Sequence, residues 1–325
     1  MSVSPLIAVQ IVTWNSAPVI GACLTALARQ TERHFEVVIV DNASTDDTVA
    51  IVQRHAQQVP GLTWLALSLN TGFCAGQNRA TQTSTAPWVL FLNPDTELPP
   101  DFIARAVATT SAIGPRVGAV APCIVRPDGS IDSTGLTMDR FRRAYDRDRG
   151  RPIANKDRAP RQVFGCTGAV ALLRRSMLDD VAVDNQVLDE RIFAYYDDLD
   201  LAWRAKLRGW TCAYEPRLTA LHHRAARNAI LQVAGRATST RDRVLSVRNR
   251  LLVMLRCDSR RAVLLALPWL LPFELARILF LLLTAPRVLG AYTDVAREIG
   301  PAMRARRTIH GRATHVAPTS LEWAP

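Results

Sequence analysis

The chain has 325 residues, 48% of them hydrophobic and 21% charged, which excludes a disordered protein and suffices for one large α/β domain with an appendage, or for two small domains. Its formal net charge is +11, but residues 236–312 hold fifteen Arg and only five acidic residues, so the rest of the chain is nearly neutral. Charge alone would suggest nucleic acid, but few aromatic residues are interleaved with the C-terminal arginines, so we expect no nucleic-acid partner.

Six scattered cysteines without a CxxC pair are typical of reduced, buried thiols rather than of a zinc site or a redox motif. The N-terminal segment has no basic stretch followed by an apolar run, so we expect no secretory signal.

The first half of the chain alternates apolar segments, typical of buried strands, with segments typical of helices. Strands are expected at 6–13, 35–41, 62–67 and 88–92, and helices at 16–30, 44–58 and 76–83. The strands are apolar along their whole length, so both faces of their sheet should be covered. We therefore predict an α/β fold with a Rossmann-like, mostly parallel sheet and helices on both faces.

After residue 115 the pattern is less regular. A Pro-Asp-Gly turn predicts a hairpin over 122–135. Residues 140–161 are rich in Arg and Asp with little periodicity, so we interpret them as a mobile loop in a position to cover an active site. A helix is expected over 197–209, with Asp200 paired to Arg204 one turn later.

The C-terminal region is expected to form two or three amphipathic helices over 236–310. We divide the chain into a catalytic domain at 1–235 and a basic amphipathic helical region with its tail at 236–325.

The apolar segment 262–285 approaches the length that crosses a bilayer. It contains Pro268, Pro272, Glu274 and Arg277, and a charge at mid-membrane costs on the order of 2.5–3.5 kcal/mol on insertion scales. We therefore favour a pair of helices lying in the interface of an anionic membrane over a span, with the flanking arginines near lipid headgroups. Packing of the segment on the catalytic domain is the alternative, and both can hold.

Polar residues follow the first two expected strands. Thr13 and Asn15 lie at the end of the first, and Asp41 at the end of the second. In an open parallel sheet, ligands bind beyond the carboxyl ends of the strands, where Asp41 can accept a hydrogen bond from a nucleobase. Either loop taken alone is better explained as an ordinary turn.

The segment NTGFCAGQN, residues 70–78, precedes and enters the third expected helix. Glycines let the backbone approach a ligand, and a helix N-terminus favours phosphate. The segment matches neither GxGxxG nor the P-loop pattern, and tight packing explains its glycines equally well.

Asn93 and Asp95 follow the fourth strand, and residues two apart in extended chain point to the same side. Their oxygen atoms suit one hard divalent cation, although a plain Asn-Pro-Asp turn is the stronger explanation for this motif alone. His222 or His223, further along, could complete such a site through an imidazole nitrogen, but a lone histidine is more often structural.

Acidic residues gather before the helix expected at 197–209, which includes Asp197 and Asp198. The helix dipole explains acids at such a position. The functional alternative is that one carboxylate accepts a proton from an attacking hydroxyl, its pKa raised by the like charges around it.

Taken together, these segments closely resemble the inverting family-2 glycosyltransferases of GT-A fold over residues 5–225. The segments that carry the resemblance are IAVQIVTWN, VVIVDNASTDDT, LNTGFCAGQNRA, VLFLNPDTEL, GCTGAVALLRRSML and LDERIFAYYDDLDLAWRAKLRGW. The nearest resemblance is to the rhamnosyltransferase-like branch that builds bacterial surface polysaccharides and cell-wall linkers, with a typical tail beginning at VRNRLLVML.

The resemblance implies a role for each matching residue. The nucleoside of the donor would be held by Thr13, Asn15 and Asp41, and its diphosphate side lined by Asn70, Gly72, Gly76, Asn78 and Asn93. Mg²⁺ or Mn²⁺ would be bound by Asp95, Asn93 and His222. Asp198 is the implied catalytic base and Asp197 its partner. Two residues depart from the family pattern, since Asn93 is neutral within the DxD-type motif and Asp197 is one methylene shorter than the usual Glu.

The implied reaction is a direct displacement with inversion at the sugar, from a dTDP- or UDP-sugar to a lipid-linked or polysaccharide acceptor at the cytoplasmic face of the cell membrane. Rhamnose from dTDP-rhamnose is the expected sugar. The acceptor is expected near residues 166–168, under the 140–161 loop.

Two other functions compete. A sugar-nucleotidyltransferase usually has a Gly-rich loop with Lys or Arg after its first strand, where this chain has TWNSAPV. A catalytically inactive, membrane-bound nucleotide-sugar-binding protein is suggested by Asn93 and Asp197.

Overall fold

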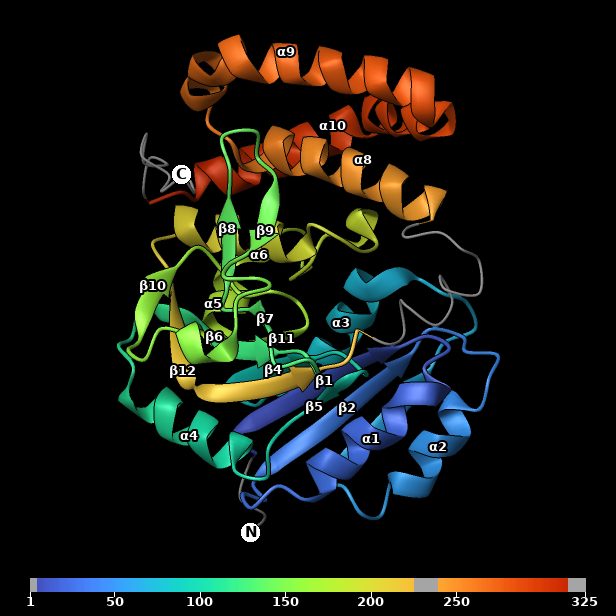
Figure 1. The fold of residues 1–325 in the computed structure, drawn as a ribbon, viewed down its shortest axis with the longest axis vertical. Helices are drawn as coiled ribbons and strands as arrows, with labels where there is room; N and C mark the ends of the chain where they lie inside the picture. The colour runs from blue at the N-terminus through green and yellow to red at the C-terminus, as the bar shows by residue number, and fades with distance from the viewer. Residues whose placement is uncertain (1–4, 225–238, 315–325) are drawn as a thin grey trace.

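A computed structural model describes residues 5–224 and 239–314 (Figure 1). Its central sheet has the strand order β10-β12-β6-β11-β4-β1-β2-β3, with β5 paired to β12 and β7 paired to β6. The parallel half consists of β1 (Ile7–Thr13), β2 (Phe35–Asp41), β3 (Leu62–Ala66) and β4 (Trp88–Leu92). The four expected strands are thereby confirmed.

The other half of the sheet is mixed. The strand β11 (Val170–Arg174) runs antiparallel between β4 and β6 (Val117–Val125), and β12 (Thr211–His222) runs parallel to β6. The remaining strands of this sheet are β5 (Thr96–Glu97), β7 (Ile131–Ser133) and β10 (Arg161–Val163). Because β6 and β7 pair antiparallel, the hairpin expected over 122–135 is confirmed.

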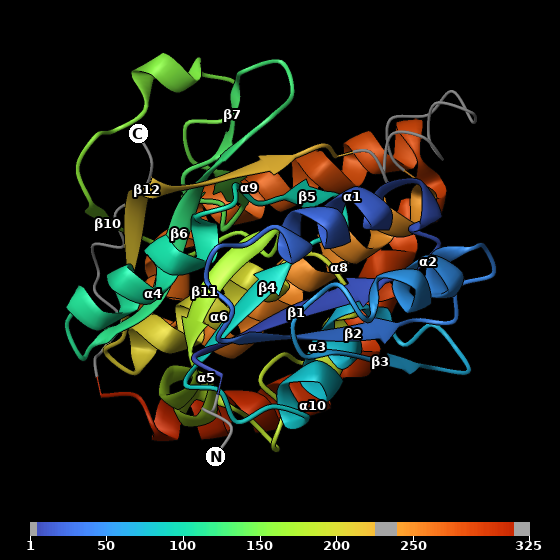
Figure 2. The same cartoon turned by 90° about the horizontal axis from the view of Figure 1, so that it is seen from below.

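Helices cover both faces of the sheet (Figure 2). They are α1 (Ala17–Ala28), α2 (Thr48–His55) and α4 (Phe102–Ala112) on one face, and α3 (Gly72–Gln82), α5 (Arg175–Val181) and α6 (Asp197–Leu207) on the other. Alternate residues of β4 separate the two cores: Val89 and Phe91 join the cluster of α5 and α6, whereas Leu90 and Leu92 join that of α1 and α4. The predicted α/β fold is confirmed.

Two helices begin where the sequence pattern did not place them. The helix α2 begins at Thr48, four residues later than expected, because the Ser44 hydroxyl donates to the Asp41 carboxylate at 2.5 Å instead of capping a helix. The helix α3 begins at Gly72, four residues earlier than expected, and this brings its N-terminus to the edge of the sheet.

The segment 140–161 is not the loop without regular structure that its composition predicted, and that interpretation was wrong. Strands β8 (Leu136–Met138) and β9 (Ala144–Asp146) form a hairpin, and a 3₁₀ turn, η1 (Ile153–Asn155), follows. At the hairpin tip, the Arg142 guanidinium donates to the Asp258 carboxylate at 2.7 Å, with both side chains no more than 2% exposed.

Three helices stack on the end of the α/β part (Figure 1). They are α8 (Thr240–Cys257), α9 (Arg260–Thr284) and α10 (Gly290–Gly311), with a 3₁₀ turn, η3 (Pro286–Leu289), before the last. Their number agrees with the two or three helices expected. The segment 262–285, however, belongs to one continuous helix rather than to a pair, because tertiary contacts hold it on one side, including the Phe273 ring stacked on Phe141 at 4.5 Å.

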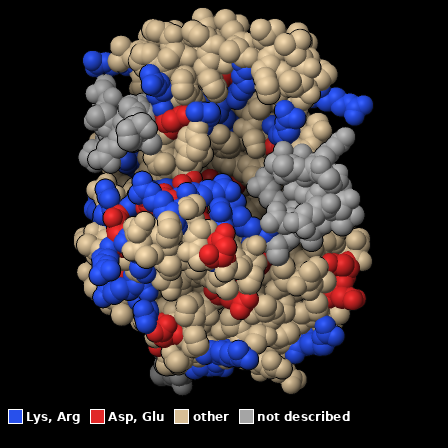
Figure 3. All heavy atoms as spheres, viewed as in Figure 1, with Lys and Arg blue, Asp and Glu red and all other residues tan. Residues whose placement is uncertain are grey.

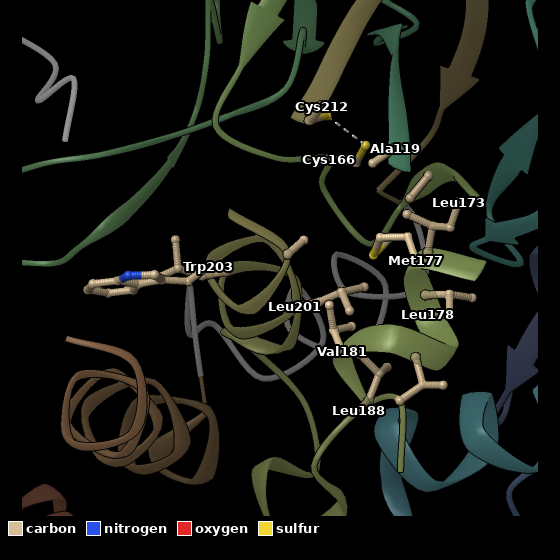
Figure 4. Packing of buried hydrophobic residues seen from close by; sticks show 14 of the residues in the cluster. Ala119, Cys166, Leu173, Met177, Leu178, Val181, Leu188, Leu201, Trp203 and Cys212 are labelled. Atoms are coloured by element: carbon tan, nitrogen blue, oxygen red, sulfur yellow. Dashed lines mark hydrogen bonds between the residues drawn. The ribbon is translucent and has the colours of Figure 1, made fainter. Parts of the chain in front are cut away.

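The C-terminal helices share a hydrophobic core with the catalytic part. Val253 and Cys257 of α8 and Ile309 of α10 belong to the same cluster as Trp203 of α6. Figure 4 shows Trp203 and Leu201 extending from opposite sides of α6, with Leu201 toward α5. The predicted boundary between residues 235 and 236 lies within 225–238, outside the described residues. All six cysteines are buried and free, as expected.

Candidate active site

The polar residues after β1 and β2 meet at the edge of the sheet. Because the two strands are parallel and in register, Thr13 lies opposite Asp41 and donates to its carboxylate at 2.8 Å. The Ser44 hydroxyl and backbone N–H also donate to Asp41, and the Asn15 side chain accepts from the Thr45 N–H at 2.8 Å. The structure thus brings Thr13, Asn15 and Asp41 together, with Asp41 only 3% exposed and fixing the loop before α2.

An open cavity of about 420 Å³ lies beyond the ends of these strands, between α3 and the first turn of α8. Thr13, Asn70 and Gly72 line it from the α/β side, and Tyr195 and Arg241 from the other. The Arg241 guanidinium lies 4.5 Å from the centre of the Phe193 ring and forms no ion pair with any carboxylate that the structure describes. The rest of the lining is largely apolar and aromatic, with one carboxylate, that of Asp242. A cavity of this size with apolar walls, a few polar groups and one cation suits a nucleotide.

The glycines of α3 permit close packing. Gly72 has φ +90°, and a Cβ on it would lie 2.5 Å from the Phe193 ring; a Cβ on Gly76 would lie 2.8 Å from Val12. Asn78 is 3% exposed and holds the backbone of Leu188 in both directions, at 2.8 and 2.9 Å. Gly72 therefore lines the cavity, whereas Gly76 and Asn78 make packing and positioning contacts.

The motif after β4 meets the end of β12. Residues Thr96 and His222 are paired across β5 and β12, which places the His222 Nε2 atom 3.2 Å from the Asp95 carboxylate. The other ring nitrogen, Nδ1, lies 2.7 Å from the Asp132 carboxylate. His223 points elsewhere and contacts Glu97 at 2.6 Å. Of the two histidines, His222 is the one at the predicted metal motif.

The surroundings of His222 favour positive charge. Burial alone would lower the pKa of His222, but its hydrogen bonds to Asp132 and Asp95 outweigh burial and raise the pKa to about 9. Burial likewise would raise the pKa of Asp132, but the hydrogen bonds from His222 and Arg224 hold it well below its usual range.

These residues fit a divalent cation as a partial ligand set. Two neighbouring ligands of an octahedral ion with bonds of about 2.1 Å lie roughly 3.0 Å apart, close to the 3.2 Å between Asp95 and His222. Within 5–224 and 239–314, no three His, Cys, Asp or Glu side chains are grouped as a metal site. The half-buried Asn93 lies two residues before Asp95. It is not one of these four residue types, but its side-chain amide oxygen can also bind a cation. The remaining ligands would then come from Asn93 and from a bound diphosphate, a usual source for such ions.

Asp197 and Asp198 begin α6, after a backbone segment in unusual geometry. Phe193, Tyr195 and Tyr196 all have positive φ, between 65° and 69°, which costs on the order of 1–3 kcal/mol for each residue of this kind. This geometry turns the chain sharply, so that the acid pair faces residues 166–168, where the Gly168 N–H lies 3.4 Å from the Asp198 carboxylate. The segment expected beside the acceptor is therefore next to the acid pair.

Burial raises the pKa of both acids. The negative charges of Asp197 and then Asp146 add to the effect of burial on Asp198, and Asp200 adds to it on Asp197. A carboxylate with a raised pKa is a stronger base than an ordinary one and holds a proton more readily.

Sequence reasoning missed three residues of this region. Asp132 stands on the short strand β7 without a motif around it, Arg241 follows a segment outside the described residues, and Asn249 lies within the VRNR motif. That motif was recognised only as typical of the family tail, and nothing in its spacing indicates what it contacts.

The fold and the site together define a GT-A glycosyltransferase: a nucleotide-sized cavity at the carboxyl ends of a parallel sheet, an Asp–His pair suited to a cation, and an acid pair with raised pKa values. Residues 8–182 match the family model "Glycosyl transferase family 2", and the chain belongs to that family. It is therefore a glycosyltransferase.

Among the curated relatives is an N-acetylglucosaminyl-diphospho-decaprenol L-rhamnosyltransferase of Mycobacterium tuberculosis, 30% identical over 252 residues, which cover 69% of this chain and 76% of the relative. A PGL/p-HBAD biosynthesis glycosyltransferase of Mycobacterium bovis is 36% identical over 106 residues, 32% of this chain and 41% of the relative.

Similar solved structures show the same fold at low identity. The mannosyltransferase PcManGT of Pyrobaculum calidifontis, in complex with GDP-Man and Mn²⁺, has a TM-score of 0.55 at 21% identity and covers 96% of this chain and 85% of its own. TarS 1–349 of S. aureus, in complex with UDP-GlcNAc, has a TM-score of 0.56 at 17% identity, over 94% and 90% of the two chains.

Proposed function

We propose that this enzyme transfers a sugar from a nucleoside diphosphate to a lipid-linked or polysaccharide acceptor in cell-surface glycan synthesis, with rhamnose from dTDP-rhamnose as the sugar. The observation that carries the proposal is the acid pair Asp197–Asp198, whose pKa values are raised. Asp198 lies beside Gly168 of the predicted acceptor segment, and the pair follows directly on residues 193–195, which line the donor cavity. The relative that acts on a decaprenol-linked sugar supports the lipid-linked acceptor and the choice of rhamnose.

The donor, a dTDP- or UDP-sugar, would lie in the cavity at the sheet edge. Thr13, which lines the cavity, would hold its nucleoside together with Asn15 and Asp41 of the adjoining loops, and Asn70, Gly72 and Arg241 would face its diphosphate. A Mg²⁺ or Mn²⁺ ion held by Asp95, Asn93 and His222 would neutralise the departing diphosphate. Gly76 and Asn78 would support this surface from within α3.

Asp198 would accept the proton of the acceptor hydroxyl. The oxygen then attacks the anomeric carbon from the face opposite the nucleotide, and the configuration at that carbon inverts. Asp197, whose negative charge helps to raise the pKa of Asp198, would keep the base basic enough for this step.

The helix α9 supports a position at a membrane surface. By length and composition it could cross a bilayer, and its most apolar stretch is only 11% buried. Five of its exposed leucines repeat at helical spacing along one side, namely Leu264, Leu271, Leu275, Leu279 and Leu282. Further exposed leucines flank that side at 265, 267 and 283. In Figure 3 the upper cap of the molecule, where α9 lies, is nearly free of charged side chains.

We favour α9 lying on the bilayer over α9 crossing it. On its inner side the Glu274 carboxylate pairs with the guanidinium of Arg250, which is 1% exposed, and accepts from Arg277 at 2.6 Å and from Tyr292 at 3.1 Å. A spanning α9 would leave the buried Arg250 without this partner, a strongly destabilising change. The enzyme would therefore bind the cytoplasmic face of an anionic membrane through the outer leucines and the nearby Arg260, Arg261 and Arg287.

Two rival functions explain less. A sugar-nucleotidyltransferase does not account for the family match over residues 8–182. An inactive binding protein would have no use for an acid pair with raised pKa values, which is costly to maintain at neutral pH.

A donor screen tests the proposal. Purified enzyme, Mn²⁺ and a polyprenyl-diphosphate N-acetylglucosamine acceptor are incubated with dTDP-, UDP- and GDP-sugars, and the nucleotide product is identified. Release of nucleoside diphosphate from dTDP-rhamnose, dependent on the acceptor, is expected. In a parallel incubation with dTTP and a sugar 1-phosphate, release of pyrophosphate would show a nucleotidyltransferase. Binding of the nucleotide without turnover on any donor would show an inactive protein.

A further inference from the structure

The backbone conformation of the segment before the acid pair requires stabilising contacts from other parts of the fold. Phe193, Tyr195 and Tyr196 are bulky residues with positive φ, a conformation that such residues adopt only when their surroundings impose it. The direction in which Asp197 and Asp198 enter α6 depends on these three residues, because they immediately precede the helix.

The C-terminal helix α8 supplies stabilising contacts to this segment. The Asn249 side-chain amide donates to the backbone carbonyls of Ile192 at 2.8 Å, Ala194 at 2.8 Å and Tyr195 at 3.0 Å. Asn249 is fully buried, and its carbonyl oxygen has no hydrogen-bond partner in the described structure. The hydrogen bonding of this side chain is therefore directed entirely at the segment before the acid pair.

Packing around the contact is tight. Arg248 donates to the carbonyl of Arg191, one residue before this segment, and α8 packs against α6 itself. On the other side of the segment, the Cys74 N–H of α3 donates to the Phe193 carbonyl at 3.1 Å. The segment is thus fixed between the donor-side helix α3 and α8, and Asn249 supplies most of the α8 contribution.

We propose that Asn249 is a positioning residue for catalysis. By binding the carbonyls of Ile192, Ala194 and Tyr195 it holds residues 192–196 in their unusual backbone geometry, and so fixes Asp198 beside residues 166–168. This inference rests on the proposed function and gives the VRNR motif of the C-terminal region a role inside the active site. Misplacement of a reacting group by about 1 Å costs on the order of 100-fold in rate.

The test compares Asn249→Leu, which keeps the volume but removes the donor, with Leu252→Ala, which removes packing from a buried residue of the same helix and breaks none of these hydrogen bonds. For each protein the folded fraction, kcat and the pH profile of kcat are measured with dTDP-rhamnose and the lipid-linked acceptor. Asn249→Leu is expected to lower kcat by about 10–100-fold and to move the acidic limb of the profile to lower pH, because a loosened Asp198 gains water.

Leu252→Ala is expected to keep both kcat per folded molecule and the position of that limb. Equal kcat and equal pH profiles in the two variants would overturn the inference while leaving the proposed function intact. Wild-type enzyme that transfers no sugar from any donor would overturn the proposed function and this inference with it. Should Asn249→Leu fail to fold, Asn249→Ser, which retains a hydroxyl donor but cannot bind all three carbonyls, is read in the same way.

Discussion

At the scale of single residues, the proposed chemistry depends on carboxylates in unusual environments. Asp198 must be ionised to accept a proton, and its pKa is raised by burial and by Asp197 and Asp146. Activity should therefore rise with pH through a limb well above the ordinary range of an aspartate, near pH 3.9. Asp198→Asn should lower kcat by about 10²–10⁴-fold, the usual contribution of a general base. A steady-state pH–rate profile of both proteins measures these effects.

The Asp198→Asn change is also expected to increase the stability of the folded protein. A raised pKa in the folded state means that the folded protein holds a proton that the unfolded chain has lost, so the contribution of Asp198 to stability falls as pH rises from about 4 through the folded-state pKa. Asp198→Asn removes this loss, about 1.4 kcal/mol for each unit by which the pKa is raised. The mutant should unfold at higher denaturant than the wild type at pH 8, with the difference shrinking toward pH 4. A mutant that is less stable at pH 8 would contradict the buried-charge account.

A change at Asp132 is expected to affect metal binding rather than the catalytic base. Its carboxylate fixes the His222 ring from the side opposite Asp95, the arrangement by which carboxylates orient metal-binding histidines. Asp132→Asn should weaken Mn²⁺ binding by about 10–100-fold, measured by isothermal calorimetry in the presence of nucleoside diphosphate. Asp139→Asn, a change in a carboxylate of the nearby hairpin that bonds Arg143 instead, serves as the control. Equal Mn²⁺ affinity in the two variants would remove Asp132 from the site.

At the scale of helices and strands, the regular part of the fold was predictable and the contacts between distant segments were not. The apolar runs of β1, β2 and β4 indicated their strands directly, because strands covered on both faces are apolar throughout. The edge strand β3 was also indicated by its apolar run, although it is largely exposed. The order of the motifs along the chain placed Asp41, Asp95 and Asp198 in the candidate site by resemblance.

The contacts of the site residues with distant segments had no local signal. Asp132 meets His222 across 90 residues, and Asn249 meets Tyr195 across 54. The β8–β9 hairpin was missed because its strands have three residues each, too few for periodicity to be visible. The single helix α9 was missed because two prolines normally end or kink a helix, and only its packing on the neighbouring helices explains why it continues.

The outer side of α9 predicts membrane binding. Leu275 and Leu279 are each 58% exposed, and burying a leucine in an apolar phase contributes about 1.5–3 kcal/mol. Leu275→Asp with Leu279→Asp should reduce binding to anionic phosphatidylglycerol vesicles by at least about 100-fold, measured by flotation. Leu69→Asp, at a leucine that is 61% exposed on the α/β part, should leave it unchanged. Vesicle binding that survives the double change would show that α9 does not face the bilayer.

At the scale of the whole molecule, the C-terminal helices link the outer side of α9, which we propose to face a membrane, to the acid pair. The apolar outer side of α9 is exposed, and on its inner side Glu274 forms an ion pair with Arg250 of α8. The helix α8 in turn binds the segment before the acid pair through Asn249. The tip of the β8–β9 hairpin is held to the same helices by the Arg142–Asp258 ion pair. A lipid-linked acceptor would therefore meet an active site fixed to the element that we propose to lie on the membrane.

The stereochemistry of transfer tests the central claim most directly, since a single carboxylate base predicts one displacement. Wild-type enzyme and Asp198→Asn are incubated with dTDP-rhamnose and the polyprenyl-diphosphate acceptor, and the first product is followed by NMR at its anomeric proton. The account predicts a glycosidic bond of configuration opposite to that of the donor, formed by the wild type and absent from the mutant over the same time. A product that retains the donor configuration, or equal product from both proteins, would contradict it.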